Sequence, residues 1–219
     1  MEKISIILVH YAMNEFRSEI MRQSILSLIE TSLDAEIIVV DNGGSKEDSR
    51  FLLGLNEERK IACYIKNRYN MSFGFARNQG LDIASGDYFV ITDNDILFKN
   101  GWLQKCKEIL DIVGDKYLVT PLRTDRQHRN FKHWRDSIKI NDIEYLVNTR
   151  AGSNCWMMTK EQYKDIGRFQ QHKVAGSKWN DEFVRKGYLM ITMEKEPLAE
   201  DMAFRKGYNI HENIINYYL

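Results

Sequence analysis

The sequence predicts an α/β protein in which helices flank a mainly parallel sheet. Two observations favour this class. Short runs rich in Ile and Val alternate with longer stretches whose apolar residues recur at helical spacing, and most of these segments end in Asp, Asn or Gly. Alternation of this kind is typical of βαβ units. With 219 residues and no break in composition, we expect one domain over residues 1–219.

The first hundred residues supply most of the alternation. Apolar β-branched runs predict the strands, and a stripe such as Met21, Ile25 and Leu28 predicts a helix. Gly86 is expected to cap the third helix. The expected elements, in chain order, are strand Ile4–Val9, a helix around Met21–Ile29, strand Glu36–Val40, helix Lys46–Leu55, strand Ile61–Lys66, helix Phe75–Ser85 and strand Tyr88–Thr92.

The second half is less regular. The tetrapeptide Arg-Lys-Gly-Tyr occurs at 185–188 and at 205–208, and each copy is expected to end a helix with glycine as the cap. The other expected elements are helix Trp102–Val113 before Gly114, strand Tyr117–Pro121, an irregular basic segment 122–139, a strand-like segment 150–158, and helix Lys160–Ile166 before Gly167.

Composition excludes several classes of protein. Hydrophobic residues make up 43% and charged residues 28%, which is typical of a globular rather than a disordered chain. The longest apolar runs are far shorter than the roughly 18 residues of a membrane span, and no signal-peptide pattern follows Met1. Cys63, Cys106 and Cys155 show no CxxC spacing, so we expect free thiols and a cytoplasmic location, with peripheral membrane attachment as an alternative.

Charge is distributed unevenly along a chain whose formal net charge is zero. Residues 1–98 carry 10 Lys and Arg against 15 Asp and Glu, and residues 99–219 carry 21 against 16. This asymmetry suggests two sub-sites with different ligands, and a solvated surface of uneven charge is the alternative.

The strongest chemical signal is Asp93-Asn94-Asp95, directly after the apolar strand Tyr88–Thr92. In open α/β sheets ligands bind beyond the carboxyl ends of the strands. Carboxylates placed there hold a hard divalent cation that neutralises a diphosphate. A solvated turn is the alternative. Asp41-Asn42-Gly43-Gly44-Ser45 ends an earlier strand and is either a plain turn or a second part of the same crevice.

Five motifs together resemble the family 2 glycosyltransferases, inverting enzymes of the GT-A (Rossmann-like) fold. The resemblance covers roughly the first 100 residues closely and the rest loosely. The motifs are Ser5–Tyr11, Ile37–Ser45, Gly74–Gly80, Ala84–Tyr88 and Asp93–Asp95.

The resemblance implies a nucleotide-sugar donor, with a UDP-sugar expected, and a Mn²⁺ or Mg²⁺ ion. Residues 1–98 would bind the donor, and residues 99–219 would bind the acceptor and supply the base. Val9, His10, Tyr11 and Asp41 would contact the base and the ribose of the donor. Arg77 would contact the diphosphate. Asp93 and its neighbour Asn94 would contact the ribose or the metal. Asp95 would be the direct metal ligand, and His211 is a candidate for a further one.

An inverting transferase also needs a base to take the proton of the acceptor hydroxyl. In the family this carboxylate opens a helix after a Gly-Gly-Phe-like turn, which Gly167-Arg168-Phe169 resembles. Asp181 is therefore the first candidate, followed by Glu182, and Asp201 in Glu200-Asp201 is the alternative. A helix-stabilising carboxylate is the simpler interpretation of each.

The segment 122–139 carries six Lys and Arg against Asp125 and Asp136, with Phe131, His133 and Trp134 between them. It is a solvated loop, a site for a phosphate-bearing acceptor such as a lipid-linked sugar or glycan, or a nucleic-acid site. Trp134 and Trp179 could stack on a sugar. A sugar nucleotidyltransferase is disfavoured because no glycine lies in Tyr11–Phe16, and the intact Asp93-Asn94-Asp95 argues against a non-catalytic sugar-binding relative.

Overall fold

The computed structural model describes residues 2–12, 14–123, 136–149, 155–170, 175–193 and 197–202; within 175–178 it describes the backbone alone. In this part of the chain nine strands form one mixed sheet in the order β3-β2-β1-β4-β9-β6-β10-β8-β7. The strands are β1 Ile4–His10, β2 Glu36–Asp41, β3 Cys63–Lys66, β4 Tyr88–Thr92, β6 Tyr117–Val119, β7 Asp136–Ile140, β8 Ile143–Asn148, β9 Cys155–Thr159 and β10 Leu189–Met193.

The first half of the sheet is parallel, as the alternation predicts. Strand β1 pairs in parallel with β2 and with β4, so Ile6 lies between Ile37 and Val90. The connecting helices are α1 Glu15–Thr31, α2 Lys46–Glu57 and α3 Phe73–Ile83. Because the three strands are parallel, their carboxyl ends meet at one edge of the sheet.

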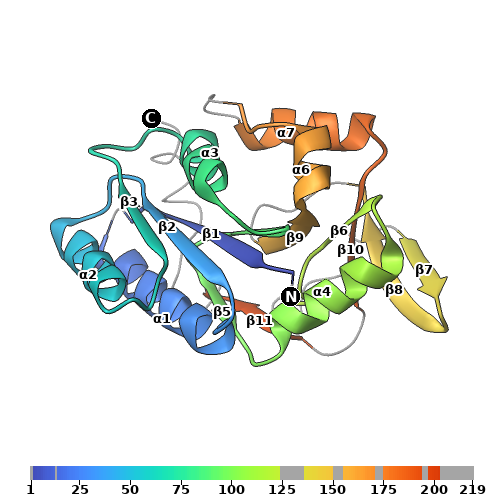
Figure 1. The fold of residues 1–219 in the computed structure, drawn as a ribbon, viewed down its shortest axis with the longest axis horizontal. Helices are drawn as coiled ribbons and strands as arrows, with labels where there is room; N and C mark the ends of the chain where they lie inside the picture. The colour runs from blue at the N-terminus through green and yellow to red at the C-terminus, as the bar shows by residue number, and fades with distance from the viewer. Residues whose placement is uncertain are drawn as a thin grey trace.

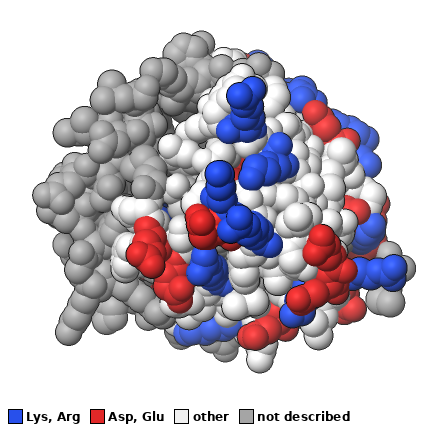
Figure 2. Space-filling model, turned by 90° about the vertical axis from the view of Figure 1, so that its left-hand side faces the viewer, with Lys and Arg blue, Asp and Glu red and all other residues white. Residues whose placement is uncertain are grey.

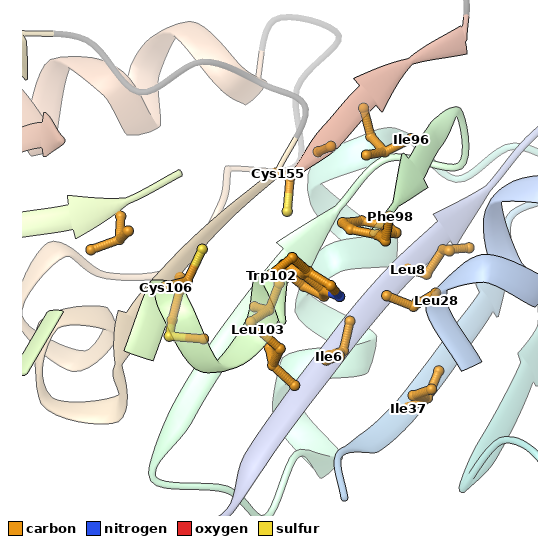
Figure 3. Packing of buried hydrophobic residues seen from close by; sticks show 14 of the residues in the cluster. Ile6, Leu8, Leu28, Ile37, Ile96, Phe98, Trp102, Leu103, Cys106 and Cys155 are labelled. Carbon is orange, nitrogen blue, oxygen red and sulfur yellow. The ribbon is translucent and has the colours of Figure 1, made fainter. Parts of the chain in front are cut away.

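Helices cover both faces of the sheet (Figure 1). One core cluster contains Ile6 and Leu8 of β1 together with residues of α1, α2 and α4 Trp102–Val113. Its centre is Trp102, which packs on Phe98 with ring centroids 4.3 Å apart (Figure 3). The opposite cluster contains Ile7 of β1 and packs against α3, α6 Lys160–Ile166 and α7 Ala175–Arg185. Alternate residues of a strand therefore serve opposite layers.

Antiparallel strands complete the sheet, and the sequence did not predict them as such. Strand β9 pairs antiparallel with β4, and β10 pairs in parallel with β6 but antiparallel with β8. Strands β7 and β8 form a hairpin. Residues 136–139 are therefore extended, whereas the sequence predicted an irregular segment. The reason is pairing: β8 supplies β7 with backbone partners that no local pattern reveals.

Two predictions at helix ends have different outcomes. Gly114 and Gly167 end α4 and α6 at positive φ, as expected. Gly86 does not cap α3, because that helix ends at Ile83 with Ala84 as its cap. A Cβ on Gly86 would lie 2.7 Å from the Lys3 carbonyl oxygen and 2.8 Å from the Ser5 nitrogen. Gly86 is therefore required by its close approach to the start of β1.

A separate two-stranded sheet joins distant parts of the chain. Strand β5 Ile96–Phe98 pairs antiparallel with β11 Ala199–Asp201, which places Asp201 opposite Ile96. This pairing lies directly after Asp93-Asn94-Asp95.

The described surface and helices add two observations. On the face in Figure 2, Lys and Arg side chains are intermixed with Asp and Glu. Within the ranges that the structure describes, no helix combines the length and the apolar character of a membrane span.

Candidate active site

The carboxyl ends of β1, β2 and β4 bring the predicted polar residues to one edge of the sheet. His10 and Asp41 are register partners at the ends of β1 and β2. Thr92 ends β4 beside Leu8, so Asp93 emerges at the same edge. The antiparallel strand β9 starts there too, with Cys155 opposite Thr92.

Asp93 pairs with Arg77 of α3. The Arg77 Nη2 lies 3.3 Å from Asp93 Oδ1. The guanidinium carbon of Arg77 lies 3.9 Å from the ring centroid of Phe73, 4.8 Å from that of Trp156 and 5.2 Å from that of Phe169. Aromatic faces attract a cation, so Arg77 is held firmly beside the carboxylate.

Asp95 pairs with Arg17, which lies in the first turn of α1. The Arg17 Nη1 is 3.2 Å from Asp95 Oδ2. The other carboxylate oxygen, Oδ1, is buried and has no hydrogen-bond partner among the described residues. A buried carboxylate oxygen without a partner is costly, so this atom is suited to a bound cation.

Asp201 is brought to the same place by the β5–β11 pairing. The Met202 N–H donates a 2.8 Å hydrogen bond to the Asp95 carbonyl. The Asp201 Oδ2 accepts a 2.9 Å hydrogen bond from Arg123 Nη1, and both side chains are buried. Arg123 reaches this position because it bridges to Ala199 of β11.

The three carboxylates influence one another electrostatically. Burial, together with the charges of Asp95 and Asp201, raises the pKa of Asp93 to about 8 against the opposing effect of Arg77. Burial also raises the pKa of Asp95, with Arg17 and Arg123 opposing. Mutual repulsion of this kind indicates a site built to receive positive charge.

His10 is a buried connector and not an exposed ligand. Its side chain is 0% exposed, and its Nε2 lies 3.3 Å from Oδ2 of Asp48 in α2. Its Nδ1 lies 2.9 Å from the Asn94 amide nitrogen. Although burial opposes it, the neighbouring His10 and a hydrogen bond from Ser18 hold the pKa of Asp48 far below its usual range. His10 therefore ties Asn94 to the helical layer.

Asp41 is buried and fully engaged within the protein. Its carboxylate accepts hydrogen bonds from the Gly44 N–H at 2.7 Å, from Ser49 Oγ at 2.6 Å and from the Tyr64 hydroxyl at 2.9 Å. These contacts fix the turn after β2. A contact of the Asp41 side chain with a donor base would require this network to open.

The remaining residues expected at the donor site differ in exposure. Val9 packs with Val40 and Ala76 in a small apolar cluster. Tyr11 is half-buried, and its carbonyl accepts a hydrogen bond from Asn94 Nδ2 at 3.4 Å.

The two candidate regions for the base lie in different surroundings. Helix α7 begins at Ala175, so Asp181 lies several residues after the start of the helix. The expectation that Asp181 opens this helix is therefore wrong. The Asp181 side chain is exposed. Glu182 pairs with Arg185. Trp179 is buried against Phe169, with ring centroids 4.9 Å apart, and belongs to the core instead of a sugar platform. His211 and Trp134 lie outside the described residues.

The described residues contain no group of three His, Cys, Asp or Glu side chains that could hold a metal by themselves. Asp95 nevertheless fits one, because Oδ1 lacks a partner. Magnesium ions are commonly held by one or two carboxylates together with substrate phosphates. Asp95, with Asp93 nearby, would supply these one or two carboxylates.

Three residues of this site were not singled out from the sequence. Arg17 and Asp48 lie in helical segments where charged residues are ordinary, and no spacing marks them. Arg123 belongs to the predicted basic segment 122–139, but its pairing with Asp201 depends on a long-range strand contact.

Comparisons with known proteins identify the family of the chain. The chain matches the family "Glycosyl transferase family 2" over residues 5–173. It is 31% identical over 175 residues to an uncharacterized glycosyltransferase of Haemophilus influenzae, covering 74% of this chain and 53% of that protein. It is 29% identical over 127 residues to a putative polypeptide N-acetylgalactosaminyltransferase 13 of Drosophila melanogaster, covering 50% of this chain and 21% of that protein.

Solved structures show the same fold. A mannosyltransferase from Pyrobaculum calidifontis in complex with GDP-Man and Mn²⁺ aligns with a TM-score of 0.70 at 16% identity, over 94% of this chain and 59% of that one. TarS from S. aureus aligns with a TM-score of 0.68 at 14% identity, over 91% of this chain and 36% of that one.

The fold and the site together define a GT-A glycosyltransferase domain. The chain belongs to glycosyl transferase family 2. It spans about half the length of the H. influenzae relative.

Proposed function

We propose that the protein transfers a sugar from a nucleoside-diphosphate donor to an acceptor hydroxyl, with inversion and with a divalent cation. The observation that carries this proposal is the convergence of Asp93, Asp95 and Asp201 at the carboxyl edge of the parallel strands. Two structures of similar fold support the donor class. The Pyrobaculum calidifontis mannosyltransferase is in complex with GDP-Man and Mn²⁺, and GalNAc-T7 is in complex with UDP, GalNAc and Mn²⁺.

The protein's own residues have separable roles in this reaction. Arg77, fixed by its aromatic neighbours, provides a guanidinium that can bind the donor diphosphate. Asn94 orients the loop between the two carboxylates through His10. Tyr11 directly follows the end of β1 and is our candidate for contact with the nucleoside.

Asp95, with Asp93, would hold Mn²⁺ or Mg²⁺. When bound, the ion would neutralise charge that develops on the diphosphate leaving group.

For the base we favour Asp201 over Asp181. A general base must lie within hydrogen-bond reach of the attacking hydroxyl, and so beside the diphosphate-binding carboxylates. Asp201 raises the pKa of Asp93 by its charge and is fixed to the Asp95 segment through Met202. The Arg123 guanidinium donates a 2.9 Å hydrogen bond to Asp201 Oδ2 and so fixes the orientation of that carboxylate.

The direct test is donor turnover. Purified protein is incubated with UDP- and GDP-sugars and Mn²⁺, and release of the nucleoside diphosphate is measured. We expect release with at least one donor, and loss of release both with EDTA and in Asp95→Ala. Activity that survives in Asp95→Ala with EDTA present would contradict the metal-dependent reaction.

We further propose that the acceptor bears phosphate. The support is the basic composition of segment 122–139, in which positive charge exceeds negative charge. A glycan or lipid-linked sugar fits this chemistry, and a nucleic acid is the second candidate because aromatic residues are interleaved with the basic ones.

A further inference from the structure

The three carboxylates of the candidate site are each paired with an arginine. The pairs are Arg77–Asp93 at 3.3 Å, Arg17–Asp95 at 3.2 Å and Arg123–Asp201 at 2.9 Å. When all three carboxylates are ionised, the three guanidinium groups balance their charge before any ligand arrives. A bare dication would add two positive charges beside three guanidinium groups. The same ion bound to a diphosphate would add little net charge.

Arg17 is the arginine best placed to change partners. Its side chain is 20% exposed, whereas those of Arg77 and Arg123 are 3% and 7% exposed. Arg77 is enclosed by aromatic rings, and Arg123 is anchored beside β11. Arg17 lies in the first turn of α1, shortly after the end of β1 at the donor edge of the sheet. Its guanidinium can therefore reorient without repacking the core.

The Asp95 carboxylate can supply only some of the ligands that a bound cation needs. One oxygen is occupied by Arg17, and the other is buried and has no hydrogen-bond partner among the described residues. No third protein ligand completes a metal cluster in the described ranges. Phosphate oxygens and water would therefore supply much of the coordination of the ion, as is usual for magnesium sites with one or two carboxylates.

From these observations we infer that Arg17 makes cation binding depend on the nucleotide. In the free protein Arg17 neutralises Asp95 and keeps a bare cation out. When a cation binds together with a nucleoside diphosphate, the Asp95 carboxylate coordinates the cation and no longer pairs with Arg17. Arg17 then pairs with the diphosphate, whose oxygens suit a guanidinium. Arg17 is thus a further donor-binding residue. This inference rests on the proposed function, since it requires a diphosphate ligand.

Isothermal titration calorimetry tests the inference directly. Mn²⁺ alone is titrated into the protein, and then UDP or GDP is titrated in the presence and absence of Mn²⁺. For the unmodified protein we expect weak Mn²⁺ binding without nucleotide and clear nucleotide binding with Mn²⁺. In Arg17→Gln, Mn²⁺ alone should bind several-fold more tightly, while the nucleotide with Mn²⁺ should bind about tenfold more weakly.

Two further variants keep the result interpretable. Arg17→Lys retains the charge but not the planar fork, so it should still exclude Mn²⁺ while weakening nucleotide binding. Arg50→Gln removes the same charge from an exposed position in α2 and should leave both affinities unchanged. Thermal melting of each variant reports whether it has folded.

The outcomes separate the inference from the proposed function. If Arg17→Gln binds Mn²⁺ and nucleotide as the unmodified protein does, or changes only one of the two affinities, the coupling role of Arg17 is wrong. Tight binding of Mn²⁺ alone to the unmodified protein would also overturn it. If the unmodified protein binds neither UDP nor GDP with Mn²⁺, the proposed function itself fails.

Discussion

The backbone N–H of Met202 donates a 2.8 Å hydrogen bond to the carbonyl of Asp95. This bond fixes the residue after Asp201 to the backbone of Asp95, the residue that the family resemblance assigns to metal binding. It therefore makes Asp201 part of the donor edge, although Asp201 lies near the end of the described chain. Asp181 is exposed on α7, a helix whose Trp179 and Phe183 pack into the core layer opposite the one that contains α1.

Replacing the two candidate bases separates their roles. Asp201→Asn keeps shape and polarity but cannot accept a proton, so turnover should fall by roughly 10²–10⁴. Asp181→Asn should retain most turnover. Donor affinity, measured by calorimetry in both variants, should change little. If Asp181→Asn gives the large loss and Asp201→Asn does not, the exposed carboxylate is the base.

The raised pKa of Asp93 predicts how stability depends on pH without metal. The folded protein holds the Asp93 proton up to about pH 8, whereas the unfolded chain releases it near pH 3.8. Between these values the folded state binds more protons, so the free energy of unfolding should decrease as pH rises from 4 to 8. Urea denaturation in EDTA at several pH values measures this slope. Asp93→Asn should flatten it, and an unchanged slope in that variant would contradict the assignment.

Arg77 is expected to contribute to stability as well as to donor binding. Its side chain is 3% exposed and contacts three aromatic rings besides Asp93. Arg77→Gln should therefore lower the free energy of unfolding by about 2–4 kcal/mol, which urea denaturation measures. Adding Asp93→Asn to this variant should restore part of the loss, because the unpaired carboxylate is removed. Strict additivity of the two substitutions would show that the pair is not coupled.

Two glycines, Gly44 just before α2 and Gly54 within that helix, offer a matched test of packing around His10. A Cβ on Gly44 would lie 2.6 Å from His10 Nε2, whereas a Cβ on Gly54 in α2 would meet nothing within 4 Å. Gly44→Ala should cost about 1–3 kcal/mol of stability, because the buried His10 must move. Gly54→Ala should gain about 0.5–1 kcal/mol. Thermal melting distinguishes them, and equal effects would show that His10 has room to adjust.

Much of the donor half could be predicted from the sequence, because its signals are local. The apolar run of β2 ends in Asp41, and the apolar run of β4 is followed by Asp93. Parallel pairing of both strands with β1 then requires these ends to meet. The position of Asp201 could not be predicted in this way. It depends on pairing between the three-residue strands β5 and β11, which are too short to show periodicity. Arg17 shows no signal of its own because its partner is distant in sequence.

The basic segment supplies a prediction about the acceptor. Residues 124–135 lie outside the described structure, so the prediction rests on charge alone. Replacing Arg126, Arg129 and Arg135 by alanine should raise the acceptor KM several-fold and weaken its dependence on salt, with donor KM within about twofold. Assays with a lipid-phosphate acceptor and with DNA separate the two acceptor classes. Unchanged acceptor kinetics at low and high salt would identify a solvated loop.

The most direct test of the account is to locate the cation. Crystals grown with Mn²⁺ and a nucleoside diphosphate would be measured at a wavelength where manganese scatters anomalously. The account predicts an anomalous peak within coordination distance of the Asp95 carboxylate and of the diphosphate, with Asp201 facing the same pocket. Nucleotide density at this edge of the sheet without a manganese peak beside Asp95, or a peak elsewhere, would contradict the assignment of Asp95 as the cation ligand.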